Sequence, residues 1–190
     1  MRSTTGAFTR ADYECLPEGF PAQLVNGWLV KEPSPTYGHQ ALVLRLGRAL
    51  ASLVPEGLVV LAPADVVIDE RNVFQPDVVV LRARPAWDGR DVGIPRLAIE
   101  VLSPSSARQD RARKAPRLLA AGVEEVWLVD PTTESVEVLD RAGRRVASGD
   151  ETLASRALPG FEVVPRALFA RPDSPPDAGR GLRSDAGSPA

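Results

Sequence analysis

Apolar and polar residues alternate along this chain in patterns that predict both helices and strands. In HQALVLRLGRALASLV, the residues Leu42, Leu46, Leu50 and Leu53 recur at helical spacing, which predicts an amphipathic helix. The runs VVVL, LAIEV, VEEVWLVD and SVEVLD predict strands, and the last two, joined by PTTE, predict an antiparallel hairpin. LVVLAPADVVID predicts one interrupted strand or two short ones.

Turn-forming residues separate these elements. Asn26 and Gly27 in QLVNGWLV tolerate positive φ, so this segment is expected to form a hairpin whose strands start the sheet. Residues 82–95 are polar and rich in Gly and Pro, and predict an exposed loop in which Trp87 packs or, alternatively, stacks on a base; packing is the expected role. Residues 1–170 are expected to form a single domain, while residues 171–190 lack periodicity and are expected to form a disordered tail.

Two carboxylates stand within the apolar runs. Side chains alternate along a strand, so Leu97, Ile99 and Val101 share one face, and Glu100 lies among apolar neighbours on the other. An ionised carboxylate in such a place is unfavourable unless it is paired or bound to a cation. Asp77, at the start of VVVL, would likewise need to be paired or bound to a cation. Two partly buried acids on neighbouring strands repel each other, and a hard divalent cation is the usual partner for such oxygen ligands.

The chain carries its positive charge almost entirely as arginine, and its lysines are Lys31 and Lys114. A lysine ammonium is a compact charge whose pKa shifts readily, unlike the guanidinium of arginine. On a helix after the second acidic strand, Lys114 shares a face with Asp110, and its stem is expected to lie toward the sheet. Pro116 requires this helix either to bend or to begin its regular part near Arg113.

Structural roles explain the same residues. Asp77 alternatively marks the start of a strand after proline, and an arginine from elsewhere alternatively neutralises Glu100. Asp110 and Lys114 alternatively form an ordinary helical ion pair worth about 0.3 to 0.5 kcal/mol. The residues by themselves therefore leave a metal site and these structural roles open.

Several motifs occur together in a family-specific order. QPD before VVVL, then AIEVLSPSS, then a D-x-x-x-K helix and AGVEEVWLVDP resemble the Uma family of restriction-endonuclease-like proteins, a branch of the PD-(D/E)XK nuclease superfamily. The resemblance runs from Tyr13 to Phe169. It implies an α/β (α+β) fold, with a restriction-endonuclease-like mixed central sheet flanked by helices.

The resemblance also implies roles for individual residues. Asp77, Glu100 and the backbone carbonyl of Val101 would hold Mg²⁺ or Mn²⁺, and Lys114 would position or help to deprotonate the attacking water. Family members commonly have a histidine where His39 stands. That residue would contact a phosphate or orient water, or else serve only at the start of its helix.

Two features depart from the family's pattern. The superfamily lysine usually lies two residues beyond the second acid, where this chain has Leu102, and the resemblance places it instead at Lys114 on the following helix. The family also usually has an acid in an early E-L-x-x-G-E segment, which is QLVNGW here. Gln23 and Trp28 thus stand where carboxylates are expected, although Gln23 still offers a neutral carbonyl oxygen to a metal or water.

The composition limits the cellular location and the binding partners that can be expected. The 190 residues are 44% hydrophobic and 25% charged, which is ordinary for a globular domain. With Cys15 as the single cysteine and no apolar run long enough to span a bilayer, a cytoplasmic protein without a membrane partner is expected. A net charge of -2 argues against a dedicated, tight DNA binder, although arginines cluster beside the proposed site at Arg108, Arg111, Arg113 and Arg117.

The leading prediction is a metal-dependent endonuclease that hydrolyses DNA phosphodiester bonds. The alternative is a catalytically impaired nuclease-fold module that acts as a scaffold, such as a homo-oligomer, or binds nucleic acid weakly. A small-molecule phosphodiesterase uses the same metal chemistry and also stays open.

Overall fold

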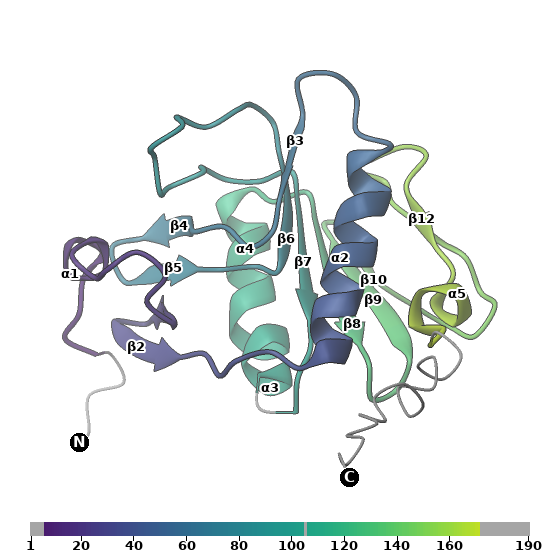
Figure 1. Ribbon diagram of the computed structural model, residues 1–190, viewed down its shortest axis with the longest axis horizontal. Coiled ribbons are helices and arrows are strands. Elements are labelled where there is room, and N and C mark those ends of the chain that lie inside the picture. Colours follow the sequence, from purple (N-terminus) through teal and green to yellow (C-terminus); the bar gives the residue numbers. More distant parts are fainter. Residues whose placement is uncertain (1–5, 105, 172–190) are drawn as a thin grey trace, which may run out of the picture.

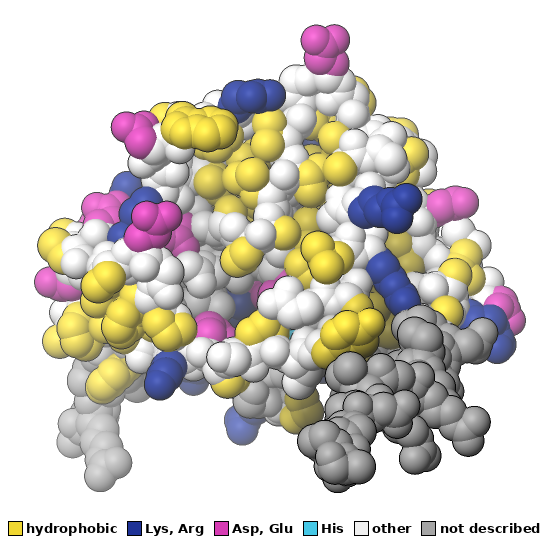
Figure 2. Space-filling model, viewed as in Figure 1, with side chains coloured by type: hydrophobic (Ala, Val, Ile, Leu, Met, Phe, Trp, Pro, Cys, Tyr) yellow, Lys and Arg dark blue, Asp and Glu magenta, His cyan; other side chains and the backbone are white. Residues whose placement is uncertain are grey.

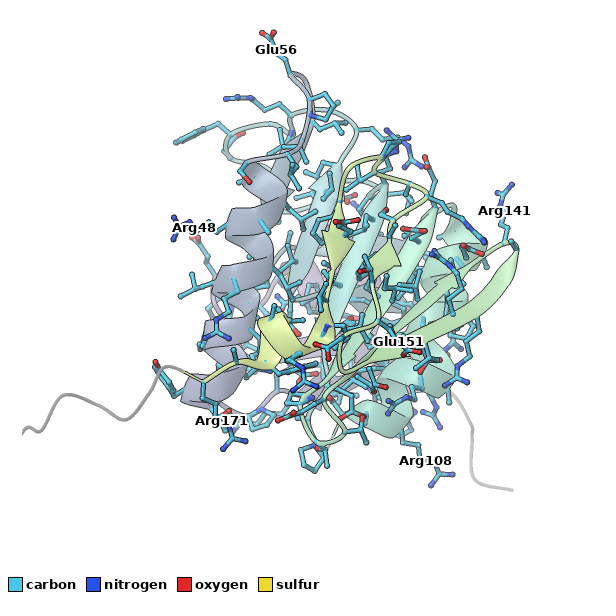
Figure 3. All side chains as sticks on the ribbon, turned by 90° about the vertical axis from the view of Figure 1, so that its right-hand side faces the viewer. Arg48, Glu56, Arg108, Arg141, Glu151 and Arg171 are labelled. Carbon is cyan, nitrogen blue, oxygen red and sulfur yellow. The ribbon has the colours of Figure 1, made fainter. Side chains whose placement is uncertain are left out.

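A six-stranded mixed sheet lies at the centre of the computed structural model, which describes residues 6–104 and 106–171. Its strands are β3 (Val59–Leu61), β6 (Val78–Leu81), β7 (Leu97–Val101), β8 (Glu125–Asp130), β9 (Ser135–Asp140) and β10 (Gly143–Ser148), in the spatial order β10-β9-β8-β7-β6-β3. Strands β7 and β8 are parallel, and the other neighbours are antiparallel. Helix α2 (Tyr37–Ala51) covers one face and helix α4 (Ala115–Ala121) the other (Figure 1, Figure 3). The predicted mixed sheet flanked by helices is confirmed.

The alternation of side chains along the strands divides the core into two layers. Val78 and Ile99 pack in a cluster with α2, whereas Val79 and Ala98 pack in a second cluster with α4. The predicted amphipathic helix contributes its buried stripe to the first layer through Leu42, Leu46 and Leu50. Leu53 was expected in the same stripe, but it lies beyond the end of α2 and is 49% exposed. Helical spacing therefore predicted the helix correctly and its last turn incorrectly.

The hairpin predicted at Asn26 and Gly27 forms, with φ angles of 52° and 73° at these two residues. The expectation that its strands start the central sheet is wrong, because they belong to a second, four-stranded sheet. LVVLAPADVVID forms two strands, and one lies in each sheet. The second sheet has the order β2-β1-β5-β4 and consists of β1 (Ala22–Val25), β2 (Trp28–Lys31), β4 (Val66–Asp69) and β5 (Asn72–Phe74).

A continuous helical segment connects the two parallel strands. It comprises α3 (Ala107–Gln109), a π-helical turn η1 (Asp110–Lys114) and α4. The backbone N–H of Ala115 donates to the carbonyl of Asp110, which closes the wider π turn. Pro116 lies in the first turn of α4, where its missing N–H costs little. The sequence left two alternatives, a bend in the helix or a regular part that begins near Arg113. The structure has the second, because the regular helix α4 begins at Ala115, next to Pro116.

The chain after β9 closes the outer edge of the domain. The predicted β8–β9 hairpin is present, and it is followed by β10, β11 (Leu153–Ala154), β12 (Glu162–Val163) and α5 (Pro165–Phe169). Trp127 is fully buried, and its ring centroid lies 5.1 Å from that of Phe161. The buried carboxylate of Glu125 accepts hydrogen bonds from Ser155 and Arg145. These contacts fasten the C-terminal segment onto β8.

Other sequence predictions have mixed outcomes. A short helix, α1 (Arg10–Glu14), precedes β1. Trp87 is 99% exposed, so its expected packing role is wrong. Of the tail predicted for residues 171–190, all but Arg171 lies outside the described residues, as does Ser105. None of the helices in the described part of the chain is long and apolar enough to cross a membrane.

Candidate active site

Asp77 and Glu100 come together through the register of β6 and β7. Val78 pairs with Ile99, and continuing this antiparallel register by one residue places Asp77 opposite Glu100. The Asp77 side chain also accepts a hydrogen bond at Oδ2 from the backbone N–H of Val101, at 2.7 Å. Two acids separated by 22 intervening residues are thus brought together at one end of the sheet. Their proximity reflects strand pairing, which neither local sequence pattern reveals.

Glu100 points toward the helical layer and meets Lys114 there. The ammonium Nζ lies 2.7 Å from Oε1 of Glu100 and 3.1 Å from Oδ1 of Asp110. Glu100 is 4% exposed and Lys114 is 2% exposed, so this is a buried cluster of charges. Asp110 and Lys114 are both turned inward from the π-helical turn. The structure therefore brings together the three residues predicted to be catalytic, Asp77, Glu100 and Lys114, and adds Asp110.

His39, in the first turn of α2, contacts the other oxygen of Asp77. Its Nε2 lies 3.0 Å from Oδ1 of Asp77. The N-cap Thr36 accepts a hydrogen bond from the backbone N–H of His39 and fixes the start of the helix. The hydrogen bond with Asp77, together with the negative charge of that carboxylate, raises the pKa of His39. Phosphate contact, water orientation and a helix-start role were the expected alternatives for His39. The geometry indicates a further role, which is to orient the Asp77 carboxylate.

Glu32 also faces the site, and sequence reasoning missed it. This half-buried residue follows β2 and accepts a hydrogen bond at Oε1 from Nε2 of Gln23, at 2.9 Å. The carbonyl oxygen of Gln23 in turn accepts from the backbone N–H of Gln75. The sequence signal for Glu32 is its position directly after β2, because β2 pairs with β1, the strand that contains Gln23. Trp28 is exposed and does not line the site.

Negative charge is in excess around Lys114. Burial raises the pKa of Glu100 well above its ordinary value; Lys114 opposes this rise, and Asp110 and Asp77 add to it. Burial likewise raises the pKa of Glu32. Burial disfavours the charge of Lys114, but Glu100 and Asp110 outweigh that effect, so the pKa of the ammonium is raised. Four carboxyl groups, those of Glu32, Asp77, Glu100 and Asp110, therefore lie around one lysine and one histidine, and their mutual repulsion adds to the effect of burial on Glu100 and Glu32.

A cleft of about 1280 Å³ opens over this cluster. Glu32, Asp77, Glu100, Asp110 and Lys114 all line it. Its walls come from the β2–α2 connection, the first half of α2, the segment after β7, the β8–β9 turn and the end of α5. Figure 1 shows that these segments, distant in sequence, meet at the lower end of the central sheet. The cleft has room for a substrate much larger than a water molecule or an ion.

The donor chemistry of the cluster fits a hard divalent cation. Carboxylate oxygens are the ligands that Mg²⁺ and Mn²⁺ prefer, and the surplus of negative charge would be relieved by such an ion. Oε1 of Glu100 is buried, and the Lys114 ammonium lies 2.7 Å from it. In the described part of the chain, no three His, Cys, Asp or Glu side chains are arranged as a ready metal site. Binding would therefore require Glu100 or Asp77 to turn from its present partner.

Two of the four arginines in the predicted cluster are engaged in structural contacts. Arg111 forms ion pairs with Asp130 and Glu137, and Arg117 donates to the side chain of Asn26. Arg108 points outward from the molecule (Figure 3). On the face shown in Figure 2, Lys and Arg side chains are scattered and do not form a continuous basic patch. This charge distribution is consistent with the sequence argument against a tight, nonspecific DNA binder.

The fold and the acidic cluster with its lysine place this chain in a class of restriction-endonuclease-like proteins. The family model Uma2, described as "Putative restriction endonuclease", matches residues 10–168, so the chain belongs to the Uma2 family. A crystal structure described as a "putative nuclease belonging to DUF820", from Anabaena variabilis, has a similar fold with a TM-score of 0.74. It is 20% identical in sequence, and the match covers 86% of this chain and 98% of that one. A comparison with curated proteins found no match.

Proposed function

We propose that this protein is a Mg²⁺- or Mn²⁺-dependent endonuclease that hydrolyses DNA phosphodiester bonds. The observation that carries the proposal is the convergence of Asp77, Glu100 and Lys114 beneath one open cleft. Membership of the Uma2 family supports the same reaction class. The absence of a long apolar helix among the described residues and the single cysteine, Cys15, are compatible with action in the cytoplasm.

The carboxylates of Asp77 and Glu100, with the backbone carbonyl of Val101, would hold the cation. When bound, such an ion polarises a phosphate oxygen and acidifies a water molecule. His39 holds one oxygen of Asp77, and the backbone N–H of Val101 holds the other, so this carboxylate is oriented before any ligand arrives. Orientation of this kind reduces the entropy lost when the reacting groups are brought together.

Lys114 supplies the fixed positive charge of the proposed reaction. Its ammonium is held between Glu100 and Asp110, and the pKa of the ammonium is raised, so it remains protonated at neutral pH. A protonated lysine stabilises negative charge that develops on the phosphate and orients an attacking water by donating to it. It is not suited to remove a proton from that water. Two roles were expected for Lys114, to position the attacking water or to help deprotonate it. The geometry favours the first.

A plasmid-nicking assay tests the proposal. Wild-type protein is expected to nick supercoiled DNA with Mg²⁺ or Mn²⁺ and to be inactive with EDTA. Asp77→Ala should reduce the rate roughly 100-fold or more, because an essential oxygen ligand is lost. Asp88→Ala is a matched control, because Asp88 is an exposed acid in the 82–96 loop outside the cleft. Equal rates for wild type and Asp77→Ala would assign the nicking to a contaminant and remove support for the proposal.

The second candidate is a nuclease-fold module that has lost turnover and serves as a scaffold or weak nucleic-acid binder. The observation in its favour is Gln23, a neutral residue where the resemblance leads one to expect an acid. Calorimetric titration with Mn²⁺ separates the two candidates. Saturable binding that disappears in Glu100→Gln favours the enzyme, and no heat at millimolar Mn²⁺ favours the module. In either case, DNA and a second copy of the chain are proposed partners that gel-shift and light-scattering measurements test.

A further inference from the structure

Gln23 poses a specific problem for the proposed reaction. It occupies the position at which a carboxylate is expected, and an amide contributes no negative charge toward a cation. Its hydrogen bonds also limit what it can offer. The backbone N–H of Gln75 donates to its carbonyl oxygen at 2.9 Å, which fixes the orientation of the amide. The NH₂ group must therefore lie on the other side, and an NH₂ group is a donor that cannot bind a cation.

That NH₂ group is directed at a carboxylate. Nε2 of Gln23 donates to Oε1 of Glu32 at 2.9 Å. The backbone N–H of Glu32 donates to the carbonyl of Pro21, so the main chain of the residue is held beside β1 as well. Gln23 itself is buried, with 3% of its surface exposed. The pair thus places one oriented carboxylate, only half-buried, next to the position where the acid is absent.

The electrostatic surroundings of Glu32 are those of the candidate site. Burial raises the pKa of Glu32, Lys114 lowers it, and Asp110 and Asp77 raise it further. Lys114 and Asp110 lie on η1 and Asp77 lies just before β6, and all three line the same cleft as Glu32. Glu32 therefore adds to the negative potential at the place where Asp77 and Glu100 would hold a cation.

We infer that Glu32 supplies the third carboxylate of the centre, which Gln23 cannot, and that Gln23 acts as a positioning residue for Glu32. The carboxylate has moved from β1 to the residue just after β2, and the hydrogen bond between the two side chains keeps it directed at the site. This inference rests on the proposed metal-dependent function. It explains how a chain without the expected acid retains the charge needed for a divalent cation.

Titration calorimetry with Mn²⁺ tests the inference without any measurement of turnover. Glu32→Gln is expected to weaken Mn²⁺ binding roughly tenfold or more, in the range seen when a group that supports a metal site is removed. The double variant Gln23→Glu/Glu32→Gln returns the carboxylate to the first position and is expected to recover affinity to within about threefold of wild type. Glu56→Gln is the control, because Glu56 is exposed at the far end of the molecule (Figure 3).

Thermal unfolding in EDTA separates this role from a purely structural one. If Glu32 supplies charge to a cation, its removal relieves repulsion in the metal-free protein, so Glu32→Gln should be at least as stable as wild type. A lower melting temperature for Glu32→Gln, with Mn²⁺ affinity equal to that of Glu56→Gln, would overturn the inference. Asp77→Asn serves as the reference for the proposed function. If Asp77→Asn abolishes binding and Glu32→Gln does not weaken it, only the inference on Glu32 fails; if wild type binds no Mn²⁺, both fail.

Discussion

Replacement of Lys114 by methionine tests the buried charge cluster most directly. The ammonium lies 2.7 Å from Glu100 and 3.1 Å from Asp110, and all three side chains are buried. Methionine has a similar length but no charge, so Lys114→Met leaves two carboxylates buried without their cation. Removal of one partner from a buried ion pair typically costs about 3 to 5 kcal/mol. For a chain of this size, that corresponds to a melting temperature lower by about 6 to 20 °C.

The loss of stability in Lys114→Met should depend on pH in a definite direction. Lys114 lowers the pKa of Glu100, so without it that pKa, already raised by burial, rises further. An acid whose folded pKa is raised destabilises the fold increasingly as pH rises from its unfolded pKa toward its folded pKa, because the unfolded chain loses the proton first. The stability difference between wild type and Lys114→Met should therefore be largest at pH 8 and should shrink as pH falls toward 5.

Urea unfolding in EDTA, followed by tryptophan fluorescence at pH 5, 6.5 and 8, measures this difference. Lys31→Met is a matched control, because Lys31 is the other lysine of the chain and is exposed on β2. Its effect should stay within about 0.5 kcal/mol at every pH. The reasoning is refuted if Lys114→Met is no more destabilising than Lys31→Met, or if its destabilisation grows as the pH is lowered.

Two further predictions concern the surroundings of the site. His39→Gln removes an imidazolium whose pKa is raised by its hydrogen bond to Asp77, so in EDTA it should cost about 1.5 kcal/mol at pH 5.5. Because a raised folded pKa stabilises only until pH passes through it, this cost should fade as pH rises through the raised pKa of His39, and a cost independent of pH would contradict the assignment. Gly27→Ala should cost about 1 to 3 kcal/mol, since Gly27 has φ +73° and an added Cβ would lie 2.6 Å from the carbonyl oxygen of Gly6. Gly47→Ala, in the open part of α2, should leave stability unchanged or increase it, and equal melting temperatures for the two alanine variants would show the turn to be unstrained.

The candidate site was only partly predictable from the sequence. Alternation along LAIEV placed Glu100 in a buried position, and the rarity of lysine singled out Lys114. The placement of Asp77 and Glu100 on neighbouring strands was inferred from the two apolar runs and supported by the family resemblance, and its physical basis is the register between β6 and β7. Neither alternation nor residue rarity singled out Glu32, and its place just beyond the predicted β1–β2 hairpin was the only available signal. Its proposed role depends on contacts with Gln23, and local patterns do not encode such contacts.

The sequence by itself determined the elements of this protein and the faces that they bury. Periods of two and 3.6 residues follow from backbone geometry, so the α2 helix and the strands β6, β7, β8 and β9 could be predicted from local pattern. Tertiary structure decided which strands pair, and it placed the first hairpin in a separate sheet. It also decided which charges meet, because the π-helical turn directs Asp110 and Lys114 toward Glu100. Pairing and charge contacts depend on the packing of residues far apart in the chain, and that packing has no local signature.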